Sequence, residues 1–527
     1  MTRIRDFKKR HPRAYRNLRD QLRQGSRFKT FGVAIIIELG RWKALTKVPI
    51  IGDLIETMNG LLAGHVSDIE LIDSANLKHG VREIVRQNVI LPEILEVDVL
   101  IIGSGPGAAV ATEIEMHNSE SNICVIERGS YPRTPISLHH SLTHVINDFF
   151  QAGQEMILAP GFPLYAQGNV LGGGSEVNSG LYHKLPELYR DKYSHALGIS
   201  PNEWLASEIE TESNLMPEKM NVSPHDSMLS RGVDGGKLIC ENVPRWRTYT
   251  ADGAYLHRGM NRIFWDSEHV QNRINLYHDS KAIHIATENK KFLEVTVQNT
   301  HSRIKTKIRT HRIHLAGGAI STPNLLAKSN LIGWGQTEFS WHPMNRIVAA
   351  TVSSDLGAGD IDPFQAWTPD RSLKFGSAVS TAPLLSVALG RHVSILEASK
   401  LRSFYSSFSS SGKGGIFPHI GMPWYRFSEQ DRRNADSGIA MLTKIITQGG
   451  GKIINLEKIS SRKFSTVHIF GTLPIDSSIY IKGSNQLCSD DRIRVSDASI
   501  LPFGPGVNPQ GVVMTTVRLA NRNLVSK

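Results

Sequence analysis

Three glycines, Gly103, Gly105 and Gly107, crowd a turn with the composition of a phosphate-binding loop. The run before them, Val97–Ile102, is β-branched and uncharged, which predicts a strand buried on both faces. The run after them (AAVATEIEMH) predicts a helix. Gly103 permits the tight turn, Gly105 lets the backbone approach a pyrophosphate, and the helix N-terminus offers free N–H groups. The turn therefore predicts a site for the pyrophosphate of a dinucleotide.

Two more residues complete the strand–helix–strand unit that this fingerprint requires. Ala108 stands at the third position of G-x-G-x-x-G/A, where a small side chain lets the helix pack close to its strand. A second apolar run, Ile123–Ile126, ends in Glu127, which we expect to accept hydrogen bonds from the ribose hydroxyls. The unit predicts dinucleotide binding but does not distinguish NAD from FAD.

A second glycine run, Gly172, Gly173 and Gly174, leaves the backbone bare, so that a flat ring can lie against its amides. Ser175 and Asn178 follow as hydrogen-bonding groups. The alternative is an ordinary flexible loop without a ligand.

The last sixty residues repeat the design of a strand, a bare turn and a helix start. Arg494–Ser496 predicts a strand, Gly504–Gly506 breaks the chain, and Asn508 is expected to cap a helix whose first turn holds Pro509. The positive end of such a helix suits the electron-rich end of a reduced flavin.

These elements must be carried by a chain of 527 residues, a length that favours two domains. The only cysteines, Cys124, Cys240 and Cys488, lie far apart and form no C-x-x-C pair. This pattern argues against a disulfide framework and a zinc cluster, and we expect no metal site. Electron chemistry would then require a bound cofactor.

The net charge of +11 is concentrated in one segment. Residues 1–30 hold eleven Lys or Arg against two Asp, so the remaining chain is nearly neutral and nucleic acid is not an expected partner. The arm is amphipathic, and Pro12 either breaks it or begins a second helix. It is expected either to contact an anionic membrane surface or an acidic partner, or to pack across the main body with its basic face in water. The expected location is the cytoplasm, with peripheral membrane attachment as an alternative.

Two further segments have a sequence pattern that predicts their structure. Alternation between Ile274 and Leu315 predicts a small antiparallel meander. The tract at 403–415 (SFYSSFSSSGKGG) is either a mobile lid over a pocket or a surface loop without a role, and Ser428 is expected to cap the helix that follows it.

Taken together, the chain resembles the glucose–methanol–choline (GMC) family of FAD-dependent oxidoreductases. Four motifs in the family's order carry the resemblance, over roughly residues 95–527: GSGPGAA at 103–109, VLGGGSEVNSGLY at 170–182, LAGGAISTPNLL at 315–326 and VSDASILPFGPGVNP at 495–509. The form GGGSEVN looks like the cholesterol-oxidase or fatty-alcohol-oxidase side of the family.

The resemblance implies an α/β fold: a Rossmann-type FAD-binding domain, with a parallel sheet, a βαβ unit and a β-meander, plus an α+β substrate domain. The FAD-binding domain is expected at 95–184, 271–332 and 465–527, the substrate domain at 185–270 and 333–464, and a basic helical extension at 1–94. Implied FAD ligands are Gly103, Gly105, Gly107, Ala108, Glu127, Gly173, Gly174, Asn178, Asp497 (toward the ribityl–phosphate portion) and Pro509. We expect the FAD to be noncovalent, because residues 172–178 contain no His or Cys.

The family's two active-site positions fall on His468 and Asn508. The implied reaction oxidises a CH–OH group of an alcohol, sugar or sterol-like substrate by hydride transfer to flavin N5, with His468 accepting the hydroxyl proton and Asn508 orienting the oxygen. The electron acceptor is O₂, a quinone or a partner protein. His342 is a weaker candidate, expected to serve packing.

One departure from the family pattern keeps a second function open. After Gly471 and Thr472 this chain continues with LPIDSS instead of a Cys-Arg-Met-Gly-like run. The alternative is therefore a flavin-retaining lyase without net oxidation, or a degenerate flavoprotein of the same fold. An NAD-dependent dehydrogenase is disfavoured, because the C-terminal motif would have no purpose there.

Overall fold

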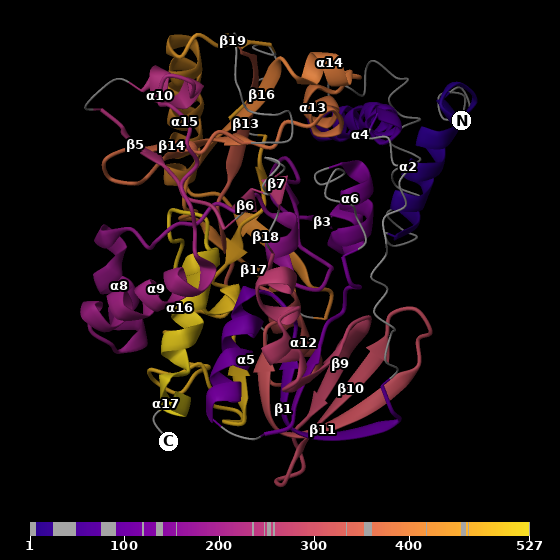
Figure 1. Ribbon diagram of the computed structural model, residues 1–527, viewed down its shortest axis with the longest axis vertical. Coiled ribbons are helices and arrows are strands. Elements are labelled where there is room, and N and C mark those ends of the chain that lie inside the picture. The colour runs from indigo at the N-terminus through magenta and orange to yellow at the C-terminus, as the bar shows by residue number, and fades with distance from the viewer. Residues whose placement is uncertain are drawn as a thin grey trace.

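Two large β-sheets organise the chain, one in the lower and one in the upper half of the view in Figure 1. The computed structural model describes residues 7–24, 49–74, 91–118, 121–132, 141–153, 155–233, 237–246, 248–249, 255–256, 259–333, 335–351, 361–417, 419–454, 460–461 and 463–525.

The lower sheet has the strand order β8-β2-β1-β11-β10-β9, with β22 paired to β11. Its parallel part consists of β8 (Ile274–Tyr277), β2 (Ile123–Ile126), β1 (Ile94–Ile102), β11 (Lys305–Leu315) and β22 (Ile493–Val495). β10 (Leu293–Asn299) and β9 (Ser280–Ala286) continue it antiparallel. The predicted α/β fold with a βαβ unit is confirmed. The meander comprises β9, β10 and β11, whereas β8 pairs in parallel with β2.

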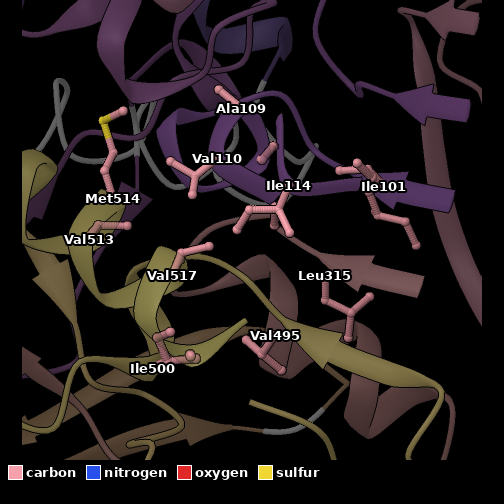
Figure 2. Packing of buried hydrophobic residues seen from close by; sticks show 14 of the residues in the cluster. Ile101, Ala109, Val110, Ile114, Leu315, Val495, Ile500, Val513, Met514 and Val517 are labelled. Carbon is pink, nitrogen blue, oxygen red and sulfur yellow. The ribbon is translucent and has the colours of Figure 1, made fainter. Parts of the chain in front are cut away.

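Two helices far apart in sequence pack together beside this sheet. α5 (Pro106–Asn118) follows β1, and α16 (Gln510–Ala520) comes near the C-terminus. Figure 2 shows Val110 and Ile114 of α5 near Val517 of α16. All three side chains are buried in one core with residues of β1, β11 and β22. This packing fixes the starts of two helices relative to the same strand ends.

The upper sheet runs in the order β3-β4-β20-β13-β16-β15-β14-β5, with β19 paired to β13. Its strands are β3 (Glu155–Met156), β4 (Leu164–Tyr165), β20 (Ser465–Thr466), β13 (Met344–Ala350), β16 (Leu401–Ser407), β15 (Lys374–Ala378), β14 (Phe364–Trp367), β5 (Ile239–Asn242) and β19 (Lys452–Ile453). The domain boundaries stay a prediction, although β3, β4 and β20 belong to this sheet and lie within ranges assigned to the FAD-binding domain.

Alternate side chains of β13 face opposite layers, as the two-residue period of a strand requires. Ile347 and Ala349 pack with α15 (Glu429–Gln448), whereas Val348 packs with α13 (Ala382–Leu389). The upper sheet is therefore covered on both faces. Ser428 caps α15 in a capping box with Asp431, as predicted.

The expectation of a lid or a surface loop at 403–415 is wrong. β16 is buried along its whole length and pairs with both β13 and β15. The tract then forms β17 (Lys413–Phe417), which makes a hairpin with β18 (Met422–Arg426). Ser403, Ser406 and Ser407 of β16 are buried by sheet pairing and by the layers on both faces, and no local sequence pattern predicts either.

The basic arm packs on the body of the molecule. α2 (Pro12–Gln24) begins at Pro12 and lies against α4 (Pro49–Ser74), with Ala14 and Leu18 buried and Arg16 exposed. The packed alternative is thus the observed arrangement within residues 7–20, and contact with an anionic surface stays a prediction. None of the helices in the described part of the chain is long and apolar enough to cross a membrane.

The remaining elements connect these layers. The helices are α6 (Leu142–Asp148), η3 (Phe150–Gly153), α7 (Gly174–Val177), α8 (Glu187–Leu197), α9 (Pro201–Leu215), α10 (Met228–Gly232), η4 (Asn261–Trp265), α11 (Glu268–Gln271), α12 (Ser321–Lys328), α14 (Ile395–Ala398), η6 (Ala498–Ile500) and α17 (Arg522–Val525). Two short ribbons pair β12 (Ser340–Trp341) with β21 (Ile469–Phe470) and β6 (Thr248–Tyr249) with β7 (Tyr255–Leu256).

Candidate active site

Two of the three glycines between β1 and α5 are required by close backbone packing. A β-carbon added at Gly103, whose φ is +112°, would lie 2.2 Å from the carbonyl oxygen of Ala316. One added at Gly107 would lie 2.1 Å from the carbonyl oxygen of Ser496. The turn therefore packs closely against the residues that follow β11 and β22. Ala108, the next residue, is fully buried in the core between helix and sheet.

Gly105 differs from its neighbours because it faces open space. A β-carbon added there would meet no atom within 4 Å, and the same holds at Gly174 in the second glycine run. The two runs adjoin, since a β-carbon at Gly173 would lie 3.0 Å from the Cα of Gly105. Together they form a bare backbone cradle at the N-terminus of α5, which fits a pyrophosphate and the flat ring system attached to it.

Glu127 lies at the end of β2 and ties the two glycine runs together. Its carboxylate accepts hydrogen bonds from the Ser104 hydroxyl at 2.6 Å and from the Gly129 N–H at 2.7 Å. Ser104 Oγ in turn accepts from the Gly172 N–H at 2.9 Å. Burial raises the pKa of Glu127. Its contact with a ribose stays a prediction.

Asp497 joins the end of β22 to the start of α12. One carboxylate oxygen accepts from the Gly318 N–H at 2.9 Å and from the Thr322 hydroxyl at 2.5 Å. The other accepts from the N–H and the hydroxyl of Ser499. Its Cα would lie 3.2 Å from a β-carbon at Gly107, so Asp497 borders the first glycine run. Contact with the ribityl–phosphate portion of FAD stays a prediction.

The second glycine run is tied to the start of α16. Asn178 Nδ2 donates to Gln510 Oε1 at 2.8 Å, and its Oδ1 accepts from the Gly180 N–H at 2.8 Å. Pro509, the residue before Gln510, is the N-cap of α16 and offers no side-chain cap. The predicted ligands Asn178 and Pro509 are thus brought to the same place.

The expectation that Asn508 caps α16 is wrong. The helix begins one residue later than predicted, at Gln510, and the Asn508 side chain turns elsewhere. Asn508 Oδ1 accepts a hydrogen bond of 2.7 Å from Lys374 Nζ, at the start of β15. Its Nδ2 makes no hydrogen bond with the residues that the structure describes, so this donor remains available.

His468, just before β21, pairs with His342, just after β12. Their Nδ1 atoms are 3.3 Å apart and their rings are nearly perpendicular, at 86°. The His342 N–H also donates to the His468 carbonyl at 3.1 Å. The hairpin of β12 and β21 therefore fixes the His468 ring, whose Nε2 makes no hydrogen bond within the described residues. His342, expected to serve packing, is a direct partner of His468.

Burial and positive charge keep both imidazoles neutral. Burial, followed by the charge of Lys374, lowers the pKa of His468 to about 3. Burial, followed by His468 and Lys374, holds the pKa of His342 well below its usual value. The lowered pKa leaves His468 unprotonated near neutral pH, with a lone pair that can accept a proton, and it also makes this ring a weaker base than an ordinary imidazole.

Sequence patterns missed Lys374. Only 4% of this residue is exposed, and no local pattern distinguishes it from a lysine in a surface strand. No hydrogen bond joins His468 to Asn508 in the described part of the chain. Lys374 links them instead, by a hydrogen bond to Asn508 and by its charge acting on His468.

The first half of the departure at 473–478 is buried, whereas Asp476 and Ser478 are exposed. Leu473 and Ile475 are buried, and their N–H groups donate to the carbonyls of Ser499 and Ile500 in η6. This run therefore supports the segment between Asp497 and Asn508.

No group of three or more His, Cys, Asp and Glu side chains within the described ranges is arranged to hold a metal ion.

Comparisons with known proteins give distant but consistent relatives. No family model matches the chain. It is 22% identical over 494 residues to the uncharacterized GMC-type oxidoreductase y4nJ of Sinorhizobium fredii, covering 80% of this chain and 93% of that protein. It is 21% identical over 512 residues to the long-chain-alcohol oxidase FAO1 of Arabidopsis thaliana, covering 80% of this chain and 66% of that protein.

One solved structure shares the fold. Pyridoxine 4-oxidase from Mesorbium loti aligns with a TM-score of 0.65 and 15% identity. The alignment covers 82% of this chain and 99% of that structure.

Proposed function

We propose that this chain is an FAD-dependent oxidoreductase of the GMC type that oxidises the CH–OH group of a small-molecule alcohol to a carbonyl, with His468 as the base and Asn508 as the group that orients the oxygen. The observation that carries this assignment is the pair of unbonded polar atoms, His468 Nε2 and Asn508 Nδ2. Asn508 lies two residues before Gln510, which bonds Asn178 of the second glycine run, and it accepts a hydrogen bond from Lys374, whose charge acts on His468.

The residues present fit FAD held without a covalent bond. The cradle of Gly105, Gly173 and Gly174 would take the pyrophosphate and ring, with Glu127 on the ribose side. When bound, FAD supplies the acceptor for the hydride that leaves the alcohol carbon. The second glycine run contains no His or Cys that could attach to the ring.

The protein's own part in the reaction is proton transfer and orientation. In the tautomer with its proton on Nδ1, His468 donates to His342 Nδ1 and keeps a lone pair on Nε2. His342 Nε2 then donates to Ser409 Oγ at 3.4 Å, which is consistent with that tautomer. Nε2 of His468 accepts the hydroxyl proton as the carbonyl forms, and the Asn508 amide donates to the same oxygen.

The substrate class follows the relatives. Long-chain alcohols are the first candidates because FAO1 is named for them, and pyridoxine is the second because the solved oxidase is named for it. The electrons are expected to pass to an acceptor such as O₂.

The test is a direct one. Purified protein should carry an oxidised flavin spectrum, and anaerobic mixing with 1-decanol, pyridoxine and a detergent-solubilised sterol should bleach it with at least one of them. Air should restore the colour with release of H₂O₂ if O₂ is the acceptor. If the protein binds FAD but no alcohol in a broad panel bleaches its flavin, the result would support the alternative of a lyase or a degenerate flavoprotein.

A further inference from the structure

Lys374 is a buried cation in the candidate active site. It begins β15, where it pairs with Trp367 of β14 and Ser407 of β16. Its Nζ lies 2.7 Å from Asn508 Oδ1 and 5.7 Å from the centre of the Trp367 ring. Only 4% of the residue is exposed.

This lysine has no anionic partner among the residues that the structure describes. The charged or titratable groups that interact with it are Arg371 and the three histidines His183, His342 and His468. Burying an ammonium without a carboxylate is costly. Such a lysine does not add to the stability of the fold. Its place beside Asn508 therefore indicates a role in the site.

The hydrogen bond to Asn508 decides what that amide can do. An ammonium group has donors only, so the amide atom facing Lys374 must be the oxygen. The Asn508 carboxamide is planar, and its Nδ2 then faces away from Lys374.

We infer that Lys374 is the positioning residue of this site: it holds the Asn508 carboxamide with Nδ2 as a hydrogen-bond donor to the substrate oxygen, and so assigns donation to Asn508 and proton acceptance to His468. The inference rests on the proposed function, since it specifies which of the two groups donates a hydrogen bond to the substrate oxygen and which accepts its proton. Without Lys374, the Asn508 carboxamide could rotate and turn its oxygen toward the substrate hydroxyl. Asn508 and His468 would then both be acceptors, and no donor would face the substrate oxygen.

Lys374 also acts on His468 through its charge. Its positive charge lowers the pKa of His468 beyond the effect of burial. Burial and Arg371 in turn hold the pKa of Lys374 well below the usual lysine value. The ammonium form is present below that lowered pKa and is lost as pH rises through it. The wild-type rate should therefore decline as pH rises through the lowered pKa of Lys374.

The experiment compares four variants by anaerobic flavin reduction with 1-decanol, or with whichever alcohol bleaches the wild type. Lys374→Met removes the charge and the donor but keeps the length of the stem, and Lys374→Arg keeps a cation. Asn508→Ala and the double variant Lys374→Met/Asn508→Ala complete a double-mutant cycle. Arg402→Met is the matched control, because Arg402 is a buried cation of β16 at the opposite end of the strand from Ser407.

Lys374→Met should keep its flavin and its fold, and its limiting rate of flavin reduction should fall about 10- to 100-fold, the scale for loss of an outer-shell partner. The apparent substrate Kd should change little, because orientation rather than binding is lost. Lys374→Arg should recover part of the rate, and the alkaline decline should be absent in Lys374→Met. The double variant should lose clearly less than the product of the two single losses, since Lys374 acts mainly through Asn508 and only in part through its charge on His468.

Additive rate losses in the double variant would overturn the inference, as would a wild-type rate in Lys374→Met or an equal loss in Arg402→Met. A wild-type protein that no alcohol bleaches would instead count against the proposed function. If Lys374→Met fails to fold, the cycle is run with Lys374→Arg. The rate difference between the wild type and Lys374→Arg should then be smaller in the Asn508→Ala background.

Discussion

His468 is suited to accept a proton because its surroundings keep it neutral. Its pKa of about 3 means that protonation does not remove the base until the solution is strongly acidic. The partner His342 is neutral for the same reason and fixes the ring from one side. The single atom left for a substrate is Nε2.

His468→Ala should keep its FAD and fold but reduce its flavin about 10²-fold more slowly or worse, the scale for a lost acid–base group. Because the His468 pKa is lowered, the wild-type rate should show no acid limb from this residue between about pH 5 and 8. Stopped-flow reduction across that range measures both. His392→Ala is the control, since His392 lies 42% exposed beside Glu70. A wild-type rate in His468→Ala would place the base elsewhere.

Gly105 and Gly107 make a matched pair that separates ligand binding from folding. Gly105→Val should fold and lose FAD, because its side chain would enter the open space of the cradle. Gly107→Val should instead lose about 3 kcal/mol or more of unfolding free energy, because its β-carbon meets the Ser496 carbonyl at 2.1 Å. Flavin content per folded protein and urea unfolding distinguish the two. Normal flavin content in Gly105→Val would contradict the cradle.

At the scale of elements, the parts that sequence patterns predict are those fixed by neighbours in the chain. The strand, turn and helix of residues 97–118 follow from an apolar run, glycines and a helical pattern, and the structure contains all three. Ser428 was found as a cap because a capping box is local. The four motifs predicted which segments would meet.

The errors arise where long-range pairing decides. Asn508 has the composition of a helix cap, but a lysine 134 positions earlier draws its side chain away. The serines at 403–407 look like a loop, yet two partner strands and two covering layers bury them. Lys374 and His342 acquire their roles only when β15 and β12 are brought beside the C-terminal segments. No window of sequence contains both members of these pairs.

The arm gives a prediction at this scale. Leu18→Asp should detach α2 from α4, because Leu18 is 3% exposed and a carboxylate cannot be buried there without a partner. Hydrogen exchange of α2 should then approach that of an isolated helix, while flavin content and flavin reduction stay unchanged. Arg16→Ala, on the exposed side, should alter unfolding free energy by less than about 0.5 kcal/mol. Unchanged protection in Leu18→Asp would show that the packing of α2 on α4 contributes nothing to holding the arm.

For the whole molecule, the site is a meeting point of distant segments. The cradle joins residues 103–108 and 172–178, and the start of α16 near the C-terminus completes it. The catalytic candidates come from the second half of the chain, His468 just before β21 and Asn508 just before α16. A ligand bound there adds contacts between segments that the Ser104–Gly172 and Asn178–Gln510 hydrogen bonds already join.

Removal of FAD should therefore destabilise the molecule as a whole rather than one loop. Acid precipitation should release the yellow colour into the supernatant if FAD is held without a covalent bond, as proposed. A ligand that binds only the folded state stabilises it by about 2.7 kcal/mol at a hundredfold excess over its Kd, so adding FAD back to apoprotein should raise Tm in a concentration-dependent way. Gly105→Val should show the apoprotein Tm at every FAD concentration. Flavin that stays with the pellet would indicate a covalent bond, and a Tm that FAD does not move would mean that the cradle does not hold it.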